Sequence, residues 1–118
     1  MRAGRTVGYL FGYGEELRRL SPGRAALYTG GEGPPPLGGS MKILWAVRDS
    51  RRLLTIAGDR LDGPGTYLES FGAVGVAGDA GDWGYYASIV SIPTAGCWRL
   101  TALSPGKRGR FAVVAIDK

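Results

Sequence analysis

The 118-residue sequence contains no histidine, no asparagine and no glutamine, and it has a single cysteine. Without histidine, the chain cannot form a Ser-His-Asp triad, a Cys-His pair or a histidine-bound zinc or haem site. It also lacks the side chain that most often acts as a general base near neutral pH. Cys97 has no second cysteine for an intrachain disulfide or a multi-cysteine metal site. These absences predict a protein that is not an enzyme and that uses no cofactor.

Asparagine and glutamine are thermolabile, so their absence predicts a thermostable protein, with GC-rich coding as the alternative explanation. Glycine and proline are abundant, with 21 and 7 residues. The hydrophobic fraction of 44% and the charged fraction of 21% are typical of a folded chain, and the length fits one domain. The sequence therefore predicts a single globular domain with many turns.

The formal net charge of +5 favours anionic partners such as nucleic acid or acidic glycans. No apolar run approaches the roughly 18 residues that a membrane-spanning helix needs, so we expect no transmembrane segment. Residues 7–13 follow a basic start, but they are too few and too rich in glycine for a secretory leader. A cytoplasmic location therefore stays open.

Short alternating or β-branched stretches, separated by Gly, Pro and Asp, predict strands along the whole chain. The stretches are residues 7–13, 25–29, 42–48, 53–57, 66–71, 73–77, 85–92, 97–103 and 110–117. Residues 42–48 and 53–57 are expected to form a hairpin. Since no helical segment of useful length accompanies them, the pattern predicts an all-β antiparallel sandwich of about seven strands.

The Gly/Pro-rich segment 30–39 separates two parts of one domain. We expect residues 1–40 to form an N-terminal strand, or arm, with a linker, and residues 41–118 to form the main body of the sandwich. The arm places four apolar side chains on one side, namely Val7, Tyr9, Phe11 and Tyr13. We expect this strand to complete its own sandwich; the alternative is strand exchange with a second copy, which would produce a homo-oligomer.

The run Ser88-Ile-Val-Ser-Ile-Pro-Thr-Ala-Gly-Cys-Trp-Arg-Leu-Thr101, with residues 42–47 and 7–11 upstream, resembles a group of small bacterial proteins with an immunoglobulin-like sandwich. The resemblance covers residues 7–117, and its distinctive part is residues 93–101. These proteins are largely uncharacterised and are usually predicted to be exported. The resemblance therefore implies an immunoglobulin-like fold and an extracytoplasmic or cell-surface location. It transfers no catalytic residue.

Basic residues cluster at two predicted turns. One turn carries Arg48, Arg51 and Arg52, and the other carries Lys107, Arg108 and Arg110. If both turns lie at the same end of the sandwich, they form one positive surface suited to phosphate or acidic sugar. The alternative is that turns carry charge simply because water surrounds them.

Aromatic residues divide into an expected core set and an expected exposed set. The core set is Tyr9, Phe11, Trp45, Tyr86 and Trp98, and the face of Trp98, Leu100 and Ala102 is expected to point inward. Trp83 and Tyr85 follow a glycine-rich loop and are the candidates for exposed recognition.

The remaining candidate sites favour structural interpretations. Cys97 is expected to be a buried structural thiol. The pairs Asp59/Asp62 and Asp79/Asp82 match no complete calcium loop, and Asp beside Gly is typical of turns, so we predict no metal site. The glycines between Gly72 and Gly78 lack the strand-to-helix context of a dinucleotide fingerprint.

The sequence as a whole predicts a non-enzymatic binding or assembly module that interacts through an edge strand or through loop ends. Its expected partner is another protein or a second copy of the chain. The alternative is a basic domain that binds anionic polymers through its arginine-rich turns.

Overall fold

The computed structural model describes residues 1–3, 6–10, 19, 22–31, 42–48, 53–72, 75–76, 83–104 and 107–117. These residues form strands almost throughout, with one short 3₁₀ turn at Thr29–Gly31. The strands are β1 (Arg2–Ala3), β2 (Thr6–Leu10), β3 (Ala26–Tyr28), β4 (Lys42–Arg48), β5 (Leu54–Arg60), β6 (Thr66–Phe71), β7 (Gly75–Val76), β8 (Trp83–Ile89), β9 (Gly96–Ser104) and β10 (Lys107–Ile116). The all-β class predicted from the sequence is confirmed.

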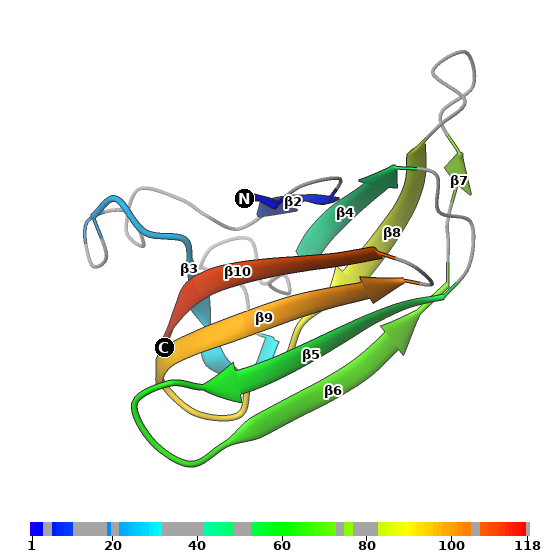
Figure 1. Ribbon diagram of the computed structural model, residues 1–118. Helices are drawn as coiled ribbons and strands as arrows, with labels where there is room; N and C mark the ends of the chain where they lie inside the picture. Colours follow the sequence, from blue (N-terminus) through cyan, green and yellow to red (C-terminus); the bar gives the residue numbers. More distant parts are fainter. Residues whose placement is uncertain are drawn as a thin grey trace.

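The strands form two sheets of five that pack face to face as a β-sandwich (Figure 1). We call the sheet with the order β1-β2-β4-β8-β7 sheet A, and the sheet with the order β3-β10-β9-β5-β6 sheet B. All pairs are antiparallel except that of β3 with β10, which is parallel. The four outermost strands are β1, β7, β3 and β6, and of these β6 alone exceeds three residues.

The hairpin expected between residues 42–48 and 53–57 is wrong. Strand β4 lies in sheet A, where it pairs with β2 and β8, while β5 lies in sheet B between β9 and β6. Each strand has one strongly apolar side, and the two sides bury each other when the strands lie in opposite sheets. The chain therefore crosses from one layer to the other between residues 48 and 54.

The core lies between the two sheets and is built on alternate residues of each long strand. Sheet A contributes Ile43, Trp45, Val47 and Tyr86, and sheet B contributes Leu54, Ile56, Trp98, Leu100 and Val113. The rings of Trp45 and Phe111 meet across the interface, with centroids 5.4 Å apart and an angle of 56° between their planes. Burying each large apolar side chain contributes roughly 1.5–3 kcal/mol, so this interface is the main source of stability. The expected burial of Trp45, Tyr86 and Trp98 is confirmed.

The alternation of aromatic residues predicts that the Tyr9 side of strand β2 faces the core. In the structure the other side of this strand faces the core. Gly8 pairs with Trp45, and a Cβ atom on Gly8 would lie 2.9 Å from Cζ3 of that ring. The missing side chain at residue 8 makes room for the indole, so Gly8 faces the core and Tyr9 points outward, where it is 50% exposed. The prediction that Tyr9 is a core residue is therefore wrong, and Phe11 and Tyr13 lie outside the described residues.

Candidate functional site

The outer face of sheet B carries three exposed arginines, Arg99, Arg108 and Arg110, which we call the arginine cluster. Along β10 the buried Gly109 and Phe111 alternate with these arginines, so Arg108 and Arg110 share the outer face about 7 Å apart. Arg110 pairs with Thr101, two residues from Arg99 on the neighbouring strand. That diagonal position also brings Arg99 within about 7–8 Å of Arg110.

One carboxylate lies beside the arginine cluster. Asp59 of β5 pairs in register with Arg99, and its Oδ2 atom lies 3.9 Å from Nη2 of that arginine. Both side chains are about half exposed, with exposed fractions of 46% for Arg99 and 56% for Asp59. Solvent screens such a pair and makes it weak, so the cluster keeps an excess of positive charge at Arg108 and Arg110.

The other basic turn predicted from the sequence lies only partly within the described residues. Arg48 is the last residue of β4 and Lys107 is the first residue of β10, while Arg51 and Arg52 lie outside the described residues. A Cβ atom on Gly109 would lie 3.1 Å from Cβ of Thr6, and Thr6 pairs with Val47 next to Arg48. The end of β4 and the start of β10 therefore lie at the same end of the sandwich, as Figure 1 also shows.

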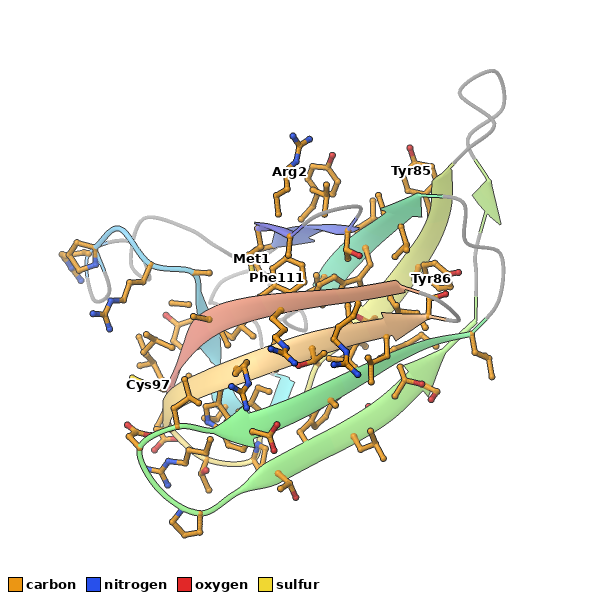
Figure 2. All side chains as sticks on the ribbon, viewed as in Figure 1. Met1, Arg2, Tyr85, Tyr86, Cys97 and Phe111 are labelled. Carbon is orange, nitrogen blue, oxygen red and sulfur yellow. The ribbon has the colours of Figure 1, made fainter. Side chains whose placement is uncertain are left out.

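The outer face of sheet A has a different composition. Its residues fall into two cross-strand rows, Val7–Ala46–Tyr85 and Tyr9–Leu44–Ala87. Tyr85, a predicted recognition residue, is half-buried in the first row, and Figure 2 shows it on the same side of the sheet as Arg2. Trp83, the other recognition candidate, begins β8 and pairs with Arg48 at the end of this face.

Hydrogen bonds of Asp62 link the β5–β6 loop to the start of β9. Its Oδ1 atom accepts hydrogen bonds from Nε of Arg60 at 3.0 Å and from the backbone N–H of Cys97 at 3.1 Å. The Arg60 bond, followed by the Cys97 bond, lowers the pKa of the Asp62 carboxyl. Within the described ranges no group of three acidic, Cys or His residues is placed to hold a metal ion. This carboxylate therefore has a structural role, and the pair Asp79/Asp82 lies outside the described residues.

Cys97 is half-buried and free, although the sequence predicts a buried thiol. Figure 2 shows it where β9 begins, and it lines a hollow of about 450 Å³ with residues from three other segments. The lining includes Arg24, Leu61, Trp98, Ala112 and Val114. The partial exposure arises because Cys97 lies on the outer side of β9, opposite the buried Trp98.

Strand β6 is the long open edge of sheet B among the described strands. It pairs with β5 on one side, and its Leu68 is 73% exposed. Tyr67 donates a 2.8 Å hydrogen bond to Oε2 of Glu69, and burial raises the pKa of the Tyr67 hydroxyl, with this bond contributing. The carboxylate of Glu69 on the edge strand is a charge of the kind that limits unwanted strand pairing.

Part of these surfaces is predictable from the sequence. The patterns indicate Arg108 in a turn and Arg110 at the start of the last strand, and the structure places both within β10. The predictions do not include Arg99 or the outward position of Tyr9. The alternation of residues 97–103 was the available signal for Arg99, because it places this residue on the side opposite Trp98.

Neither family models nor curated proteins match the sequence, and no solved structure matches the fold. Among the described residues we find no helix with the length and apolar character that crossing a bilayer requires.

Proposed function

We propose that this protein is a non-enzymatic binding module of the immunoglobulin-like class whose ligand is an anionic polymer. The strand orders support the class. Within the two five-stranded sheets, the order β2-β4-β8-β7 of sheet A and the order β5-β9-β10 of sheet B correspond to the two sheet orders of immunoglobulin sandwiches. The lack of histidine supports a role without catalysis, and the sequence resemblance supports an extracytoplasmic location.

The arginine cluster is the observation that carries the proposed ligand. Arg108 and Arg110 follow one strand about 7 Å apart, so a chain with regularly repeated phosphate, sulfate or carboxylate groups can contact both at once. Arginine presents a planar fork of donors that fits such oxyanions better than an ammonium group does. A polymer gains from several weak contacts together, whereas a single small anion does not.

The double variant Arg108→Ala/Arg110→Ala tests this proposal. Two exposed ion pairs contribute up to about 1 kcal/mol each, so we expect roughly tenfold weaker binding to heparin or to a labelled oligothymidylate. Fluorescence anisotropy or isothermal calorimetry at fixed salt measures the change. Arg24→Ala is the matched control, because it also removes one exposed arginine. The carbonyl of the next residue, Ala25, accepts a hydrogen bond from the N–H of Val114, which places Arg24 near the other end of β10. Equal binding by the double variant and the wild type would contradict the proposal.

A second proposal is assembly through an edge strand, which the six-residue open edge of β6 and its exposed Leu68 favour, although the Glu69 carboxylate on the same strand opposes pairing. Exchange of the N-terminal strand between copies is the related route, although β2 pairs within its own sheet here. If β6 pairs with a second copy, the mass measured by light scattering should rise with concentration. Leu68→Lys should prevent this rise, and Leu61→Lys, at a loop leucine that is 56% exposed, should not. A wild-type chain that stays monomeric at every concentration would refute assembly.

A further inference from the structure

The outer face of sheet A is apolar and aromatic, whereas that of sheet B mixes the arginine cluster and Asp59 with apolar residues such as the exposed Leu68. An antiparallel sheet with one solvated face usually alternates apolar and polar residues along each strand. In sheet A this alternation fails, because Tyr85, Ala87 and Ile89 follow each other along the outer side of β8. Ile89 is 48% exposed and Tyr9 is 50% exposed. The face therefore presents apolar surface to solvent.

Two tyrosines stand on this face, on the two strands that flank β4. Tyr9 lies on β2 and Tyr85 on β8, two strands apart and offset by two residues. The strand spacing and residue rise place their Cα atoms about 12 Å apart. On β4, between the two tyrosines, lie Leu44, which pairs with Tyr9, and Ala46, which pairs with Tyr85 and is 4% exposed. The two aromatic rings therefore lie too far apart to stack on one planar group.

The charge on this face is positive. Arg2 is exposed, pairs with Val7 and points to the same side as Tyr85 in Figure 2. Among the described residues no carboxylate lies on the outer side of β2, β4 or β8. An electroneutral or basic partner surface is therefore a poorer fit than one that carries negative charge.

A second copy of the chain is also a poor fit. Three strands and five residues give a strip of about 15 × 17 Å, roughly 250 Å². A stable dimer needs roughly 800 Å² from each partner. The occupant must instead be narrow, negatively charged and able to present separate planar groups to Tyr9 and Tyr85.

From these features we propose that the outer face of sheet A binds single-stranded nucleic acid, with one base stacked on Tyr9, another on Tyr85 and a phosphate on Arg2. This inference rests on the proposed binding of anionic polymers and names the polymer. Aromatic platforms with adjacent cations bind single strands without sequence preference, because every base has a flat face. The arginine cluster has no aromatic neighbour among its described cross-strand partners, so it contributes charge but no stacking.

The test measures anisotropy of a fluorescent oligothymidylate and, separately, binding of heparin. Tyr9→Ala and Tyr85→Ala should each weaken oligothymidylate binding about tenfold or more and leave heparin binding unchanged. Tyr9→Phe and Tyr85→Phe should keep the wild-type affinity, because stacking needs the ring and not the hydroxyl. Quenching of wild-type tyrosine fluorescence by the oligonucleotide should accompany binding. Thermal unfolding checks the fold of each variant, and Tyr9→Ala, at a half-exposed ring, carries the test if Tyr85→Ala fails to fold.

Three outcomes would overturn the inference. Alanine variants that bind oligothymidylate as well as the wild type, while heparin still binds, would refute stacking but leave the proposed function standing. A neutral or acidic oligosaccharide whose binding depends on both tyrosines more strongly than that of oligothymidylate would assign the face to glycans. If neither oligothymidylate nor heparin binds, the inference and the proposed function are refuted together.

Discussion

Trp45 joins the two layers of the core through its ring, while its indole nitrogen finds a partner within sheet A. The ring packs against Phe111 of sheet B, and the indole N–H donates a 2.9 Å hydrogen bond to Oγ of Ser88. The Ser88 hydroxyl in turn donates to the backbone carbonyl of Ile43 at 3.1 Å. A polar group buried without a partner destabilises the fold, so Ser88 makes the burial of this indole possible.

Replacing Ser88 with alanine should therefore be destabilising. The change leaves the indole N–H of Trp45 without this acceptor, which costs about 1–3 kcal/mol in the free energy of unfolding. Urea denaturation measures the loss. Ser70→Ala is the matched control, because Ser70 is exposed where it meets Thr55, and we expect a change within about 0.5 kcal/mol. Equal effects of the two substitutions would contradict the role given to Ser88.

The loop between β5 and β6 shows how one carboxylate holds neighbouring elements together. Asp62 binds Arg60 and the N–H of Cys97, and Leu61 N–H donates to the Cys97 carbonyl at 2.7 Å. Residue 96 must be glycine at this junction. Its φ is 142°, and a Cβ atom there would lie 2.6 Å from Oδ1 of Asp62. The glycine of the distinctive Ala-Gly-Cys-Trp run therefore has a structural explanation.

Asp62 should make the stability of the fold depend on acid pH. Its pKa is lowered from 3.8 in the folded chain, so its contribution is present above that value and is lost as pH falls through the lowered pKa. We expect Asp62→Asn to destabilise the protein at pH 6, and the difference from wild type to shrink below about pH 4. Chemical denaturation at several pH values measures this, with Asp59→Asn as the control. A difference that is constant with pH would contradict the account.

Individual strands show what local sequence patterns can predict. The strand at residues 42–48 was predicted with the bounds that the structure has, because its alternation is regular and its inward residues are large. Its partner was predicted wrongly, because pairing depends on which sheet a neighbouring strand joins, and turn residues alone do not encode that. The inward side of β2 was misjudged because Gly8 leaves space for a ring that belongs to β4, a long-range contact that residues 6–10 do not reveal.

At the scale of the whole molecule, the two outer faces divide the roles proposed for the protein. Sheet B presents the arginine cluster, and sheet A presents Tyr9, Tyr85 and Arg2. The composition predicted an affinity for anions through the net charge of +5, but not where the charge lies. The position of Arg99 beside Arg110 follows from the register of β9 with β10, which only the folded structure provides.

Salt dependence of binding tests the central claim, that the protein binds an anionic polymer through its arginines. For wild type and for Arg108→Ala/Arg110→Ala, the affinity for a labelled oligothymidylate is measured across a series of salt concentrations. The logarithm of the wild-type affinity should fall linearly with the logarithm of salt concentration. Each phosphate contact contributes about 0.7 to the slope for a single strand, so the double variant should have a slope smaller by about 1.4. Wild-type binding that is absent, or that does not change with salt, would contradict the claim.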